Sequence, residues 1–406
     1  MFAVCALWAL SALLRHAWPD ADYYPVDFKY FWLAGALWSE GLSPYGPALQ
    51  TLGADLFPGD RINPFFYPPS WRLLTSALAA MPPNIAESLW AAMSAVAIAG
   101  SAWLSALIAN ILYPDGLSRA RIFALVFGVI CVGAHAVEIS IQIGQPAPYL
   151  LLAFCALLYS TLRPNALLTA AALTILLLKP QLGAPVALAC LLIPSMRRGL
   201  AAAAAISAAL TIYGLGLAPI DTLNSFLANI SLYGSFPENA ALMTSGPVFF
   251  FGLADETPFN AFVMLGLSFA LIAVAGGLIA KRSAPFDGET ALHFIFFSAA
   301  VSLFLMPTHN FDFLVLAPLL VLMWGCGRWI LWTAAIGLFL TMRAMSLSLL
   351  MLGVFFADKT VNVSLFDTLG SLAIAVAAGA LLFGEARSTT TAAGATLTSL
   401  AGRRPA

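Results

Sequence analysis

Charged residues are scarce in this sequence of 406 residues: Asp, Glu, Lys and Arg make up 9% of it, whereas hydrophobic residues make up 61%. Soluble domains carry about 25% charged residues, so a soluble globular chain is excluded. The net charge of −1 argues against nucleic-acid binding, which requires a concentrated basic surface. The 29 Phe, 10 Trp and 10 Tyr residues exclude intrinsic disorder. The composition therefore indicates a polytopic membrane protein.

Cysteine is also sparse, and the five cysteines lie singly in apolar runs without a CxxC pair or another metal-ligand spacing. We interpret them as packing residues. Asp20 and Asp22 resemble the Asp-x-Asp metal motif of nucleotide-sugar enzymes, but here they directly follow an apolar run of spanning length. We interpret this pair as a solvated turn and keep it as a minor option for a metal site. We expect no required metal and no other cofactor.

Apolar runs of helical length predict a transmembrane helical bundle. Lys179-Pro180 either joins two short spans or breaks one helix, so we expect about 10–13 spans. The predicted spans are near residues 1–17, 84–112, 121–137, 147–162, 165–179, 182–195, 199–217, 259–280, 290–306, 311–326, 329–356 and 366–384.

The distribution of Lys and Arg predicts an inner N-terminus, because 11 of the 18 basic residues then fall on the inner side, in short loops and the tail. Residues 1–384 form one transmembrane domain in this prediction. Its two long outer loops are residues 18–83 and 218–258. The small polar residues of 385–406 predict a disordered cytoplasmic tail.

The first outer loop contains an aromatic-rich segment from Asp27 to Trp38 with helical periodicity, which Gly41 is suited to end. Such a helix is too polar to span and is expected to lie in the membrane interface. Asp27 then lies at the start of the helix, where an acid either interacts favourably with the helix dipole or acts on a lipid-borne group.

A series of short motifs runs in order along most of residues 20–325. They are Asp27-Phe28-Lys29-Tyr30, Gly41-Leu42-Ser43-Pro44-Tyr45, Phe66-Tyr67-Pro68-Pro69, Gly144-Gln145, Lys179-Pro180, Arg197-Arg198 and His309. In this order they resemble glycosyltransferase family 87. The resemblance implies an all-α polytopic transmembrane bundle of GT-C type with interfacial helices in the first outer loop. It also implies a polyprenyl-phosphate sugar donor, commonly carrying mannose.

The resemblance implies that Asp27 is the catalytic base of an inverting transfer, since an acid in the first outer loop has this role in GT-C enzymes. A carboxylate can accept the proton of an acceptor hydroxyl as the new bond forms. The candidates for binding the donor phosphate are Lys179, His309 and Gln145. Snorkelling is the alternative for Lys179, and simple packing is the alternative for His309.

Further side chains are possible substrate-binding residues. Glu138, Gln142 and Gln145 are spaced to share one helical face, and Asp312 is spaced to pair with His309. An aromatic belt at the membrane interface explains the tyrosines equally well. The full set of possible substrate-binding residues is Tyr30, Tyr45, Tyr67, Gln142, Glu138, Arg343 and Asp312.

These features predict a membrane hexosyltransferase that moves a hexose, most simply mannose, to a lipid or glycan acceptor. The predicted location is the bacterial cytoplasmic membrane, with the active site on the periplasmic face and a role in the cell envelope. The partners are membrane lipids, the donor and the acceptor. The alternatives are a lipid or glycolipid transporter or flippase, and an inactive relative in which Asp27 only caps a helix. Transport is disfavoured because, apart from Lys179 and Arg343, the centres of the spans are almost free of charge.

Overall fold

The described elements of the protein, in a computed structural model, are all helices. The structure describes residues 26–60, 62–114, 134–216, 218–232, 258–282, 286–323, 327–342 and 359–384. The helices of the first half are α2 Val26–Ser39, α3 Pro47–Leu56, η1 Pro69–Trp71, α4 Arg72–Ala79, α5 Pro83–Leu112, α7 His135–Ile143, α8 Ala147–Leu162, α9 Ala166–Leu177 and α10 Pro180–Leu192. Those of the second half are η3 Pro194–Met196, α11 Arg197–Leu215, α12 Pro219–Leu232, α15 Pro258–Ala280, α16 Gly288–Leu305, η5 Asn310–Leu316, α17 Leu319–Leu322, α18 Arg328–Thr341 and α20 Lys359–Phe383.

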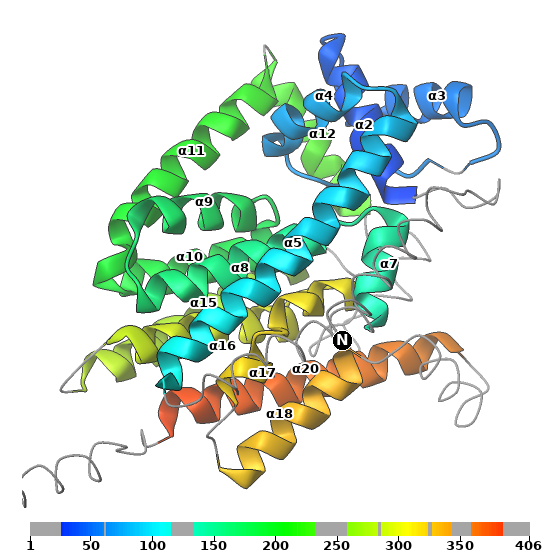
Figure 1. Ribbon diagram of the computed structural model, residues 1–406. Helices are drawn as coiled ribbons and strands as arrows, with labels where there is room; N and C mark the ends of the chain where they lie inside the picture. The colour runs from blue at the N-terminus through cyan, green and yellow to red at the C-terminus, as the bar shows by residue number, and fades with distance from the viewer. Residues whose placement is uncertain are drawn as a thin grey trace, which may run out of the picture.

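The described helices form a bundle with a smaller layer at one end (Figure 1). The bundle contains the large apolar core, to which α8, α10 and α16 contribute most of their buried side chains. The smaller layer, called here the outer layer, consists of α2, α3, η1 and α4 and has its own aromatic core. α5 begins at the outer layer and runs down across the bundle (Figure 1).

Five described helical stretches are long and apolar enough to cross a membrane: Pro83–Leu112, Pro194–Leu215, Phe262–Ala280, Gly288–Leu305 and Phe366–Phe383. Five further apolar helices have 10–17 residues. The prediction of an all-α polytopic membrane protein is confirmed. The predicted span 1–17, most of 121–137, the second half of 329–356 and the tail 385–406 lie outside the described residues.

The chain reverses direction at Lys179-Pro180, so α9 and α10 are two short helices that lie side by side (Figure 1). Gly183 makes the close turn possible, because a Cβ there would lie 2.4 Å from the Leu176 carbonyl oxygen. α8 runs away from the outer layer, α9 runs back toward it, and α10 runs away again. Residues 145 and 179 therefore come to the same end of the bundle.

The segment predicted as one span over 311–326 differs from a regular helix. It forms the 3₁₀ helix η5 followed by the four-residue α17. Pro318 at the junction has no N–H with which to continue the hydrogen-bonded ladder, which explains the interruption. Residues 310–316 therefore do not continue as a regular α-helix, and their polar groups lie at the end of the bundle.

The predicted helix of the first outer loop is α2, and it ends as expected at Gly41. Gly41 has a φ of +77°, and the Leu42 N–H donates to the Leu37 carbonyl at 2.9 Å, a Schellman ending. Most aromatic side chains of α2 are buried within the outer layer, where Phe31 stacks on Trp71 with 4.7 Å between ring centroids, and Trp32 is half-buried. These side chains form a protein core.

Arg72 joins the outer layer to the bundle. Its guanidinium donates to the carbonyl of Trp38 in α2 and to that of Tyr213 in α11, both at 3.2 Å. The segment predicted as the second outer loop contributes as well, since Asn229 of α12 donates its amide to the Phe65 carbonyl at 3.1 Å. These contacts fix the last turn of α2 and the segment at Phe65 relative to the bundle.

Gly35 provides a test of this packing. A Cβ at Gly35 would lie 2.0 Å from the Thr75 carbonyl oxygen, so Gly35→Ala should push α2 away from α4. Overpacking of this kind costs about 1–3 kcal/mol. We expect a lower apparent melting temperature of the purified protein, whereas Gly46→Ala, with no atom within 4 Å of the new Cβ, should melt like the wild type. Equal melting of the two variants would contradict the close crossing.

Candidate active site

Asp27 lies in the first turn of α2, at the boundary between the outer layer and the bundle. Its carboxylate accepts a hydrogen bond from the Gln145 side-chain amide. The Gln145 carbonyl oxygen in turn accepts from the Tyr67 hydroxyl at 3.1 Å. Because one amide bonds both partners, its orientation is fixed: the nitrogen faces the carboxylate and the oxygen faces the phenol. Three segments distant in sequence thus meet at one carboxylate.

Gly144 explains how Gln145 reaches Asp27. It ends α7 with a φ of +78°, in the left-handed region. A Cβ at this position would lie 2.5 Å from the Phe28 Cβ and 3.0 Å from the Phe28 backbone nitrogen. Glycine therefore satisfies both the turn and the direct approach of the turn between α7 and α8 to the first turn of α2. Gln145 follows at once and α8 begins two residues later.

Burial raises the pKa of the Asp27 carboxyl from its usual value to about 6. The Gln145 hydrogen bond and the nearby charge of Lys179 both oppose the increase, since each favours the ionised form. With a pKa of about 6, the group is mostly ionised at neutral pH and still basic enough to take up a proton. Such a pKa suits a general base.

Lys179 lies at the turn between α9 and α10 and is 9% exposed. Its ammonium group pairs with the carboxylate of Asp312, which is 3% exposed. The ammonium nitrogen also lies 5.2 Å from the centre of the Phe311 ring. The carbonyl of the preceding Leu178 accepts a hydrogen bond from the Trp71 indole at 2.9 Å. The outer layer and η5 therefore hold Lys179 from two sides.

Asp312 contacts His309, as its spacing had suggested, and it also has a partner distant in sequence. Its side chain pairs with Lys179, and its second oxygen accepts the backbone N–H of His309 at 3.2 Å. The His309 ring stacks on Phe311 with 5.1 Å between ring centroids. The sequence had indicated no acid near Lys179, because the two residues are 133 positions apart.

The site collects six predicted residues at one end of the bundle: Asp27, Tyr67, Gln145, Lys179, His309 and Asp312. α2, α8 and α10 all begin at this end. The start of a helix carries partial positive charge from its unpaired N–H groups. A carboxylate with a raised pKa therefore lies close to a buried ion pair and to several sources of positive potential.

Two predicted tyrosines are buried in the aromatic core of the outer layer. Tyr30 is 6% and Tyr45 is 4% exposed. The Tyr45 hydroxyl donates to the Tyr67 carbonyl at 2.7 Å, so Tyr45 supports the segment that bears Tyr67. Gln142 lies in the last turn of α7 and is half-buried. The predicted Glu138 side chain, Arg343, Asp20 and Asp22 lie outside the described residues.

The sequence reading gave no separate role to Lys29, which follows Asp27 by two residues. Lys29 is buried, pairs with the half-exposed Asp60, and lies 5.0 Å from the centre of the Phe57 ring. This contact ties the first turn of α2 to the end of α3. The position of a lysine within an aromatic run could have indicated a buried charge. Its partner could not be predicted, because Asp60 is 31 positions away.

The Lys179–Asp312 pair can be tested by a double-mutant cycle. Lys179→Met and Asp312→Asn each leave one buried charge without its partner, and each should destabilise the protein by about 3–5 kcal/mol. The double variant removes both charges while the Asn side chain keeps an acceptor for His309. We expect its loss of stability, measured by chemical unfolding in detergent, to be smaller than the sum of the single losses. Additive losses would contradict a direct pair.

The comparison with known proteins identifies the family. No curated protein and no solved structure matches the chain. The model of glycosyltransferase family 87 matches residues 65–307, more than half of the chain. The match contains Tyr67, Gln145 and Lys179, whereas Asp27 precedes it and His309 and Asp312 follow its end. The chain belongs to glycosyltransferase family 87.

Proposed function

We propose that this membrane glycosyltransferase transfers a hexose from a polyprenyl-phosphate donor to a hydroxyl of a lipid or glycan acceptor. Mannose is the first candidate for the hexose. The observation that carries the proposal is the Asp27 carboxylate, bonded to Gln145 and within the electrostatic influence of Lys179. A base for the acceptor hydroxyl and a nearby cation for the leaving phosphate are what the transfer of a sugar from a lipid phosphate requires. The polyprenyl donor and mannose follow from the family resemblance.

Asp27 is the base in this mechanism. It accepts the proton of the acceptor hydroxyl while that oxygen forms a bond to the anomeric carbon of the sugar. The bond between the anomeric carbon and the phosphate oxygen breaks at the same time, and its electrons leave with the lipid monophosphate. A single base on the face opposite the leaving group gives inversion, so a β-linked donor yields an α-linked product.

Gln145 acts as a positioning residue in this mechanism, although the sequence had suggested phosphate binding. Its amide nitrogen is bonded to Asp27 and its oxygen to Tyr67. One carboxylate oxygen of Asp27 is thereby engaged, and the other is left to meet the acceptor hydroxyl. Tyr67 contributes indirectly, because its hydroxyl fixes the orientation of the Gln145 amide.

Lys179 stabilises the leaving phosphate. In the structure its charge is balanced by Asp312. A donor phosphate shares or replaces this partner, and the N-terminal ends of α8 and α10 add positive potential. His309, adjacent to the pair through its N–H bond to Asp312, is the second group in reach of the phosphate. The mechanism assigns no step to a metal ion.

The active site faces the outer, periplasmic side in this proposal. Five described basic residues, Arg163, Arg197, Arg198, Lys281 and Arg282, lie at the ends of helices that point away from Asp27. Gly288 at the start of α16 lies next to Thr161 at the end of α8, in agreement with this arrangement. Basic residues favour the cytoplasmic side of a membrane, which supports an outer position for Asp27 and a location in the bacterial cytoplasmic membrane.

Asp27→Asn tests the base. The amide keeps the shape of the side chain but cannot accept the proton, so transfer should be about 10²–10⁴ times slower. Transfer is measured with purified protein in lipid, labelled polyprenyl-phosphate mannose and an envelope lipid extract as acceptor. Asp55→Asn, which changes an exposed acid of α3, is the matched control and should keep full activity. Near-wild-type transfer by Asp27→Asn eliminates Asp27 as the base, and translocation of the donor without any transfer by the wild type favours the flippase alternative.

Gln145→Leu tests the positioning role through the pH dependence of kcat/KM. The Gln145 hydrogen bond lowers the pKa of Asp27, so its loss must raise that pKa. Activity requires the ionised carboxylate, and it should decline below about pH 6 in the wild type. In the variant this acid limb should move to higher pH. Tyr67→Phe keeps the amide and should shift the limb less; an acid limb unchanged in Gln145→Leu would contradict the role.

A further inference from the structure

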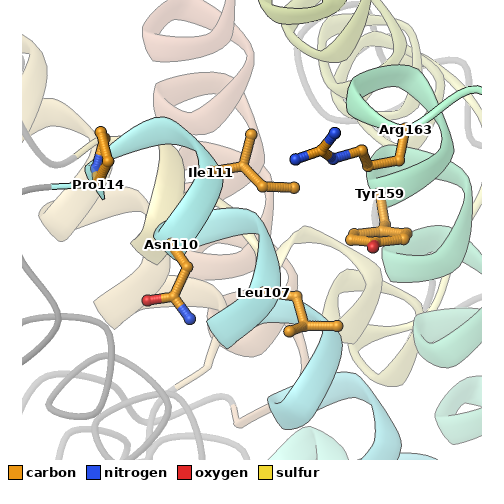
Figure 2. Close-up of a pocket in the computed structure, with 6 residues that line it drawn as sticks. All are labelled: Leu107, Asn110, Ile111, Pro114, Tyr159 and Arg163. Atoms are coloured by element: carbon orange, nitrogen blue, oxygen red, sulfur yellow. The ribbon is translucent and has the colours of Figure 1, made fainter.

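A cavity of about 410 Å³ lies between the last turns of α5 and α8 (Figure 2). It is large enough for a small ligand or a lipid headgroup. None of its residues belongs to the candidate active site. The residues that line it are Leu107, Asn110, Ile111, Pro114, Tyr159 and Arg163.

The polar wall of the cavity consists of hydrogen-bond donors. Arg163 follows the end of α8, and its guanidinium extends across the gap toward Ile111 of α5 (Figure 2). Tyr159 lies one turn earlier, where its carbonyl accepts the Arg163 N–H at 3.0 Å. Asn110 adds an amide from α5, and no acid is among the lining residues. A guanidinium with a phenol and an amide matches the oxygens of a phosphate group.

The apolar part of the lining consists of Leu107 and Ile111 of α5, a helix with the length and composition of a membrane span, and of Pro114, which follows the end of that helix. Trp103, one turn before Leu107, is 63% exposed, so the apolar surface continues from the cavity along α5. A cavity with cationic and apolar walls, opening along a span, suits a ligand that joins a phosphate to hydrocarbon.

The depth of the cavity separates it from the active site. α8 begins beside Gln145 and ends at Arg163, and its 16 residues span roughly 24 Å at 1.5 Å per residue. The hydrocarbon core of a bilayer is about 30 Å thick. If Asp27 lies at one headgroup layer, Arg163 therefore lies close to the other.

We propose that this cavity binds the phosphodiester of an anionic phospholipid from the leaflet opposite the active site. Arg163 pairs with the phosphate, Tyr159 and Asn110 donate to its oxygens or to the headgroup, and the α5 wall holds the glycerol and the first acyl carbons. The ligand is a resident membrane lipid, distinct from the sugar donor.

The test measures lipid retention by native mass spectrometry. Delipidated protein is incubated with phosphatidylglycerol, phosphatidylcholine, polyprenyl monophosphate or glycerol phosphate. We expect preferential retention of phosphatidylglycerol, reduced about tenfold or more by Arg163→Gln because charge-assisted hydrogen bonds are lost. Tyr159→Phe, which removes one hydroxyl, should reduce retention less.

Arg198→Gln is the matched control. It removes the same charge from an exposed arginine at the start of α11, outside the cavity. It should retain phosphatidylglycerol like the wild type. Equal loss in Arg163→Gln and Arg198→Gln would overturn the site, because it would indicate general charge attraction. Preferential retention of polyprenyl monophosphate or of glycerol phosphate by the wild type would overturn the identity of the ligand.

Discussion

The hydrogen bond between Gln145 and Asp27 links the two layers of this protein at the point where the chemistry is proposed. It is possible only because Gly144 lets the turn between α7 and α8 touch the first turn of α2, where any side chain would collide with Phe28. The aromatic core of the outer layer fixes the other partner, since it buries α2 on most sides. Both cores therefore help to position the same carboxylate. The core of the outer layer fixes the helix that bears it, and the core of the bundle fixes the amide that orients it.

The acidity of Asp27 reflects opposing contributions. Burial raises its pKa, whereas the Gln145 amide and the charge of Lys179 lower it. Burial alone would raise the pKa of the carboxyl further and favour the protonated form, which cannot act as a base. With stronger stabilisation of the carboxylate, it would be ionised but a poor proton acceptor. Asp312 is part of this balance, because its pairing with Lys179 offsets the positive charge near Asp27. A phosphate that draws Lys179 toward itself would change the basicity of Asp27 as the donor binds.

Features that depend on residues close in sequence, such as helices and their ends, were predicted. Contacts between residues distant in sequence were not. The helices α5, α8 and α16 follow from long apolar runs, and the end of α2 follows from Gly41. The site was harder to predict. Asp27 and Gln145 are 118 positions apart, and Lys179 and Asp312 are 133 apart. The order of the motifs identified most of these residues as candidates, but it carries no information on which of them contact one another. It could not indicate that Asp312 would neutralise Lys179 or that Gln145 would bond the acid.

The helix α8 connects the two ends of the bundle. It begins beside Gln145 and ends at Arg163, so the acid and the exposed arginine are held apart by one rigid helix. The end with Asp27 is closed over by the outer layer, which supplies an acid and buried polar groups. The other end has only short described turns with exposed basic residues. Because positive residues favour the cytoplasmic side, the arginine end supports the proposed orientation in the membrane, and through α8 it supports the proposed position of the carboxylate near the opposite surface.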